Sequence, residues 1–150
     1  MNSLNEIEDF LNSECFAVVG VSRSDKKFGN VIFKELNKKG KKAFAINNKV
    51  TAGGIGDIYP NFQSLPQKAD AAIINIAPRE SLNAVKEAYE SGIRKIWLQQ
   101  GAQSPEAVKF CGENGIPVIS NLCILMFAVP GQFPHNLHKW FLNIFGKYPA

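Results

Sequence analysis

Small, polar and basic residues follow the first apolar run of the chain, which ends at Gly20. Ser22 and Ser24 carry hydroxyl groups, and Arg23 between them carries a positive charge. Hydroxyl groups, the main-chain N–H groups of a tight turn and the start of a following helix are groups that bind phosphate oxygens. Because a helical pattern begins a few residues later, the stretch VVGVSRSDKKFGN predicts an anion-binding loop. It lacks the G-x-G-x-x-G pattern of a dinucleotide-binding turn, since its only other glycine is the distant Gly29.

Five short apolar runs predict the strands that must position this loop. They cover residues 15–20, 42–47, 71–78, 95–100 and 116–120, lengths that suit strands rather than helices. Helical patterns lie between them, and three helices are predicted to end at Gly40, Gly92 and Gly115, where glycine allows the left-handed turn. The third predicted helix opens with Ser104-Pro105, a capping hydroxyl followed by proline. Alternating strands and helices predict an α/β fold: a Rossmann-like, doubly wound, parallel five-stranded sheet in three α/β/α layers, with strand order 3-2-1-4-5.

The segment 51–67 is longer than an ordinary connection in such a fold and is rich in glycine at its start. Loops of this length in a compact domain are often functional. We expect it to lie beside the ligand edge and to contain a short extra element near Ile58-Tyr59.

Ligands of open parallel sheets bind beyond the carboxyl ends of the strands, so the residues that follow each strand form the candidate site. Those residues are rich in amides, hydroxyls and cations, and none is a carboxylate, which predicts an anionic ligand. Asn30, at the start of the first helix after the loop, joins the predicted cofactor-binding set. The other members are Gly20, Val21, Ser22, Arg23, Ser24, Asn47, Asn48, Lys49, Ile76, Ala77, Pro78 and Arg79, with Gln99, Gln100, Gly101 and Asn121 at the remaining strand ends.

Three classes of ligand compete for this edge. An NAD site would have a second glycine near position 22 and an acidic residue after the second strand, where this chain has Ser22 and Asn47-Asn48. An NADP-dependent oxidoreductase could use Lys49 on the extra phosphate, but the glycine pattern still fails. A ligand with a pyrophosphate and one further phosphate fits better. Nucleic acid is the weakest candidate, because the lysine-rich residues 34–49 show no clear pattern of the interleaved aromatic residues and cations that single-strand binding requires.

Several segments in order resemble the small stand-alone CoA-binding proteins, a family related to the CoA-binding domain of the succinyl-CoA synthetase alpha subunit. The resemblance extends over residues 16–123 and depends on the order and spacing of the motifs. They are FAVVGVSRS, AINN, IYPNFQSLP, IAPRES, WLQQGAQSPEAV and the final strand running into Cys123.

This resemblance implies that coenzyme A, free or as an acyl thioester, is the ligand. The CoA pyrophosphate would lie on residues 20–24 and the start of the next helix, the adenine and ribose phosphate near Asn47, Asn48 and Lys49, and further contacts at residues 76–79. Many relatives carry a serine-tyrosine pair or similar after the first loop, where this chain has Phe28-Gly29-Asn30. No nucleophile–base pair or metal-ligand spacing is visible at the predicted edge, so we favour non-catalytic binding over an unrecognised nucleotide-binding enzyme.

Length and composition predict a single domain, residues 1–150, of an ordinary soluble globular class. The net charge of +4 suits a polyanionic ligand. The start of the chain has no signal-peptide pattern and the longest apolar run is too short to span a membrane, so we expect a cytoplasmic protein. Cys15, Cys111 and Cys123 are too scattered for a disulfide frame or a zinc site, and we expect no metal.

The tail extension, residues 124–150, is predicted to contain a turn and then an amphipathic helix whose apolar stripe must be covered. We expect the stripe to dock on the domain or to form a homodimer. A membrane surface is the least favoured, because the polar face has few cations. The two histidines of this helix are expected on its solvated face. The stripe is formed by Leu137, Trp140, Phe141, Ile144 and Phe145.

Overall fold

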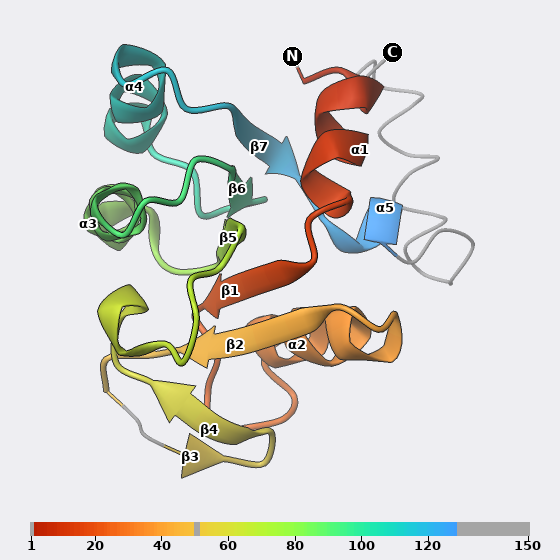
Figure 1. Ribbon diagram of the computed structural model, residues 1–150. Helices are drawn as coiled ribbons and strands as arrows, with labels where there is room; N and C mark the ends of the chain where they lie inside the picture. The colour runs from red at the N-terminus through yellow and green to blue at the C-terminus, as the bar shows by residue number, and fades with distance from the viewer. Residues whose placement is uncertain (1, 50–51, 129–150) are drawn as a thin grey trace.

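The computed structural model describes residues 2–49 and 52–128, which form one α/β unit (Figure 1). Its strands are β1 (Cys15–Val19), β2 (Lys42–Ile46), β3 (Ala52–Gly53), β4 (Gly56–Tyr59), β5 (Ala71–Ile74), β6 (Ile96–Gln99) and β7 (Val118–Leu122). Its helices are α1 (Leu4–Leu11), α2 (Phe28–Lys38), α3 (Pro78–Glu90), α4 (Pro105–Glu113), α5 (Leu125–Ala128) and the 3-10 turn η1 (Phe62–Ser64).

Seven strands form one sheet in the order β3-β4-β2-β1-β5-β6-β7, and all neighbours are parallel except β3 and β4. The predicted count of five was too low, because the segment after β2 supplies two short strands. Of these, β4 pairs with β2 through Ile58 and Tyr59, which confirms the extra element expected there. The predicted order is also corrected: β5 lies beside β1, on the side away from β2, and the place next to β2 belongs to β4.

Helices cover both faces of the sheet, as the doubly wound prediction requires (Figure 1). One face packs against α1, α2 and α5, and its core contains the buried residues Phe16, Trp97 and Leu125. The opposite face packs against α3 and α4 through Val85 and Cys111. Strands β1, β5 and β6 are buried along their whole length, because a parallel sheet covered on both faces has no solvated side.

The predicted helix ends are confirmed. Gly40, Gly92 and Gly115 have φ angles of 75°, 86° and 64°, the left-handed region that glycine adopts without steric cost. Ser104 caps α4 by accepting a hydrogen bond from the Ala107 N–H, with proline at the first helical position.

Two predicted strand bounds are wrong. The run 71–78 ends as a strand at Ile74, because Pro78 instead begins α3, where the fixed φ of proline suits the first helical turn. The run 116–120 becomes β7 two residues later. Ile116 is still tied to the end of α4 by its N–H bond to the Cys111 carbonyl, and Pro117 has no N–H to offer.

The predicted tail helix, its apolar stripe and the homodimer that it would form lie outside the described residues. Only the short helix α5 belongs to the described part of the tail. Within residues 2–49 and 52–128, no helix combines the length and apolar character needed to cross a membrane.

Candidate functional site

The loop of residues 20–24 is compressed between two main-chain segments, and glycine makes both approaches possible. Gly20 has a φ of 103°, and a Cβ there would lie 2.8 Å from the Asn75 carbonyl carbon after β5. Gly29, in the first turn of α2, approaches from the other side, where a Cβ would lie 2.9 Å from the Gly20 carbonyl carbon. Gly29 therefore has the same role as the glycine that allows close helix–strand packing in a dinucleotide-binding fold: it lets the start of α2 approach the end of β1.

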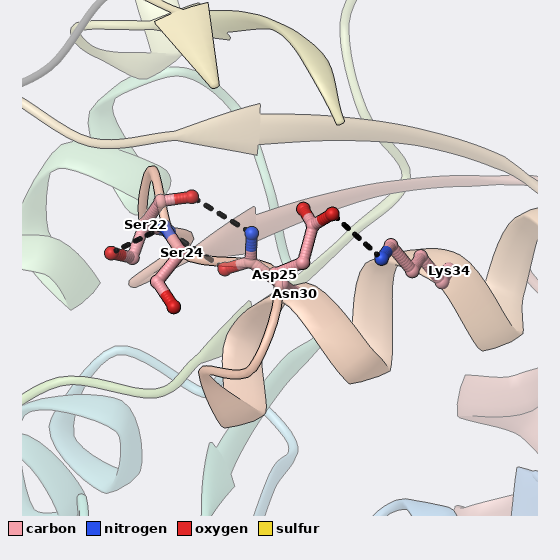
Figure 2. A network of polar contacts seen from close by, with 5 residues as sticks. All are labelled: Ser22, Ser24, Asp25, Asn30 and Lys34. Carbon is pink, nitrogen blue, oxygen red and sulfur yellow. Dashed lines mark hydrogen bonds and ion pairs between the residues drawn. The ribbon is translucent and has the colours of Figure 1, made fainter. Parts of the chain in front are cut away.

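Two side-chain amide groups, one buried and one partly exposed, tether this loop from opposite sides. Asn30 is fully buried: its Oδ1 accepts from the Ser22 N–H at 2.8 Å and its Nδ2 donates to the Ser22 carbonyl at 2.8 Å (Figure 2). From the end of β2, the Asn47 Nδ2 donates to the Val21 carbonyl at 2.7 Å. The Asn47 Oδ1 also accepts from the Lys49 N–H at 2.8 Å, so the same side chain shapes the turn that carries Lys49.

The tethers decide which donors remain for an anion. The Ser22 N–H is taken by Asn30, and the Ser24 N–H donates to the Ser22 hydroxyl at 3.3 Å. In the described part of the chain, the N–H groups of Arg23, Phe28 and Gly29 form no hydrogen bond. Since α2 also begins without an acidic residue or a capping side chain, its N-terminal partial charge is uncompensated. The loop and the helix start therefore offer a phosphate group main-chain donors and positive charge.

The β3–β4 hairpin forms the outer wall of the loop. Gly53 lies against Arg23, where a Cβ would be 3.0 Å from the Arg23 Cα, and Gly54 lies against the Asp25 carboxylate. That carboxylate is paired with Lys34 at 3.5 Å, and both side chains are about half exposed (Figure 2). The pair places the one acidic group of the loop toward α2 and offsets its charge.

A cleft of about 280 Å³ lies beside the loop, at the carboxyl ends of β1 and β2 and against α3. Of the predicted site residues, it brings together Gly20, Asn47, Asn48, Lys49 and Ile76. We call it the β1–β2 cleft, and its remaining lining residues are Val19, Ile46, Pro60, Glu80, Asn83, Ala84 and Glu87.

The expectation of an edge without carboxylates is wrong for this cleft, because Glu80 and Glu87 line it. Sequence reasoning counted only residues that directly follow strands, whereas these two come from the flank of α3. A signal was available: Glu80, Asn83 and Glu87 recur at intervals of three and four residues, so they lie on one face of the helix.

The other predicted residues are distributed away from the cleft. Ala77, Pro78 and Arg79 form the start of α3 and do not line it. Gln99 is buried, and its Oε1 accepts from the Ile124 N–H at 3.1 Å, which is a structural role at a strand end. Gln100 and Asn121 line a separate groove of about 700 Å³ at the outer edge of β7.

The three cysteines are buried thiols. Burial raises the pKa of Cys111 to about 11, and burial together with the nearby Asp70 carboxylate raises the pKa of Cys15. None of them lines the β1–β2 cleft. Among the described residues, no group of three or more His, Cys, Asp or Glu side chains has the arrangement of a metal site.

The sequence model of the CoA binding domain matches residues 14–128, which includes the loop, both amide tethers and the cleft. The chain belongs to the CoA-binding domain family. The free N–H groups of Arg23, Phe28 and Gly29 are donors of the kind that bind phosphate oxygens.

Several known proteins are similar to this chain over most of its length. A conserved hypothetical protein from Pyrococcus furiosus is 31% identical, with a TM-score of 0.69 over 75% of this chain and 97% of that one. The alpha subunit of ADP-forming acetate–CoA ligase II from the same organism is 22% identical over 94% of this chain and 32% of its own length. The chain therefore spans about a third of that curated relative.

A solved structure of the dinucleotide-forming acetyl-coenzyme A synthetase 1 of Ca. Korarchaeum cryptofilum shares the fold. Its TM-score is 0.65 at 23% identity, over 77% of this chain and 28% of that one.

Proposed function

We propose that this chain binds coenzyme A or an acyl-CoA, with the diphosphate on the 20–24 loop and the adenosine part in the β1–β2 cleft. The observation that carries the proposal is that Gly20, the first residue of the loop whose Arg23 N–H is free, lines the same cleft as Lys49. Both halves lie within the segment matched by the CoA binding domain. A nucleotide with a diphosphate and a further phosphate can use both at once.

The charged groups around the cleft predict how the ligand is oriented when it binds. Phosphate groups are attracted to the loop, the α2 start and Lys49, and are repelled by Glu80 and Glu87 on α3. The same carboxylates accept hydrogen bonds from an adenine amino group or a ribose hydroxyl. The neutral base is therefore expected toward α3, with the phosphates toward the loop.

Binding without chemistry is the simpler role for this site. Among the residues that the structure describes, the lining of the β1–β2 cleft includes no cysteine, serine or histidine, and its charged side chains are Lys49, Glu80 and Glu87. The raised pKa of the buried Cys111 keeps that thiol protonated and unreactive at neutral pH. The role proposed is therefore that of a CoA carrier, sensor or subunit.

A thermal-shift panel tests this proposal. The chain is heated with CoA, acetyl-CoA, dephospho-CoA, NADP or NAD at equal concentrations. A ligand specific for the native state adds about 2.7 kcal/mol of stability at a hundred times its dissociation constant. We expect CoA and acetyl-CoA to raise the melting temperature most, and NAD to have no effect. A shift with NADP and none with CoA would refute the proposal.

A further inference from the structure

Asn30 is completely buried, and both polar atoms of its side chain are hydrogen-bonded to the same residue, Ser22. It is the third residue of α2, has no exposed surface, and directs its amide away from the helix toward the 20–24 loop (Figure 2). Its oxygen accepts from the Ser22 N–H and its nitrogen donates to the Ser22 carbonyl, both at 2.8 Å. Because the amide is planar, two such bonds fix the peptide groups on both sides of Ser22.

The next peptide group is the one whose donor is free. The N–H that follows the Ser22 carbonyl is that of Arg23, which bonds to no group in the described chain. The carbonyl of Ser22 and the N–H of Arg23 belong to the same planar unit, so a bond that fixes one also orients the other. Because the C=O and the N–H of a trans peptide point in opposite directions, Asn30 fixes the Arg23 N–H in a direction away from its own side-chain amide.

We propose that Asn30 is a positioning residue for the diphosphate of the ligand. It does not touch the ligand; it holds the Ser22–Arg23 peptide group so that the free Arg23 N–H keeps one fixed direction, away from the Asn30 amide, in which it can donate to a phosphate oxygen. The inference rests on the proposed function and adds to it the residue that organises the loop beforehand. Such preorganisation raises affinity because the loop need not be ordered on binding.

The neighbouring contacts separate this role from general support of the fold. Asn47 secures the preceding residue through the Val21 carbonyl, and Gly20 is bonded through its N–H to the Ile46 carbonyl at 3.1 Å. The loop thus stays attached to the sheet without Asn30. The Val21 carbonyl and the Ser22 N–H share one peptide group, so Asn47 also holds that group. What Asn30 alone fixes is the peptide group between Ser22 and Arg23.

The test compares Asn30→Asp with Asn37→Asp by calorimetric titration of the full chain. Asp at position 30 keeps the shape and the acceptor for the Ser22 N–H, but an ionised carboxylate cannot donate to the Ser22 carbonyl. Asn37 lies on the same helix, is exposed, and bonds only within α2, to the Phe33 carbonyl at 3.1 Å. Each variant is titrated with CoA and with adenosine 3′-phosphate, which lacks the diphosphate.

We expect Asn30→Asp to weaken CoA binding by about tenfold or more, a change of about 1.4 kcal/mol, and adenosine 3′-phosphate by less than about threefold. Asn37→Asp should leave both affinities within about twofold of the wild type. Asn30→Ala serves as a second variant, since it removes both bonds without adding charge, and it should show the same contrast between ligands.

Three outcomes overturn the inference, and they are distinguishable. Unchanged CoA affinity in both Asn30 variants refutes the positioning role alone. Equal weakening of the two ligands, with a lowered melting temperature, shows a purely structural role. A wild-type chain that binds neither ligand refutes the proposed function itself, and the inference with it.

Discussion

Replacing Gly29 with alanine tests whether the close approach of α2 to β1 builds the loop. A Cβ at this position would lie 2.9 Å from the Gly20 carbonyl carbon and 3.3 Å from the Val21 nitrogen, and nearer still to the Gly20 oxygen. Ordinary contacts begin at 3.4 Å, so α2 must move by at least about 0.5 Å. The atoms that it meets are main chain and cannot rotate away. Overpacking of this kind costs about 1–3 kcal/mol, against a gain of up to about 1 kcal/mol in helix propensity.

We therefore expect Gly29→Ala to lower the free energy of unfolding by about 1–2 kcal/mol, which is roughly 2–8 °C in melting temperature for a chain of this size. The matched control is Gly112→Ala in α4, where a Cβ would meet nothing within 4 Å and φ is not in the left-handed region. That control should be neutral or stabilising. Chemical denaturation measures both, and titration with CoA should show about a tenfold loss for Gly29→Ala only. A Gly29→Ala variant as stable and as tight as the wild type would refute the reasoning.

Three further predictions concern single side chains. Lys49→Ala should weaken CoA binding by about fivefold, the modest effect of removing an exposed charge, and should weaken dephospho-CoA binding less, as measured by calorimetry. Equal losses for the two ligands would refute a contact between Lys49 and the ribose phosphate. Ser104→Ala should lower the free energy of unfolding by about 1 kcal/mol in a urea titration, because it removes the cap of α4; no change would contradict the N-cap assignment. Cys111 should resist alkylation in the native state at pH 8 and react in denaturant. Its folded pKa of about 11 lies above the unfolded value, so the free energy of unfolding should fall as pH rises from about 9 to 11. The fall should be smaller for Cys111→Ala, and an identical pH profile of the two chains would argue against the raised pKa.

The parts of the fold that local chemistry decides could be predicted from the sequence. Gly40, Gly92 and Gly115 end helices because their positive φ angles favour glycine, and Ser104-Pro105 begins one because its cap and its fixed φ are both local. These signals act within a few residues, so one sequence suffices to interpret them. Strand order could not be predicted from such local signals, because it depends on which strand pairs with β2. The strand that does so is β4, which has only four residues.

Helix α1 was missed although the signal was present. Ser3 and Glu6 form a capping box, in which the Ser3 N–H donates to the Glu6 carboxylate at 2.7 Å, and Ile7 and Phe10 are buried one turn apart. The Ser3 N–H lowers the pKa of Glu6 below its usual value.

The sequence predicted several of the residues that gather at the candidate site, but not what their side chains contact there. The residues after β1 and β2 do meet at the β1–β2 cleft, since parallel strands end at one edge. Asn30 was expected among the ligand contacts, but both polar atoms of its side-chain amide are hydrogen-bonded to Ser22. Glu80 and Glu87 were missed because they depend on how α3 packs across the sheet. Contacts between elements distant in sequence decide such details, and composition does not encode them.

Mapping amide chemical shifts during a CoA titration tests the central claim most directly. A ¹⁵N-labelled chain is titrated to saturation, and the shifts are followed for each assigned N–H. The account predicts saturable changes concentrated at Arg23, Phe28, Gly29 and Lys49, with the β7 edge at Gln100 and Asn121 unaffected. Changes centred on that edge, or none at millimolar CoA, would contradict it.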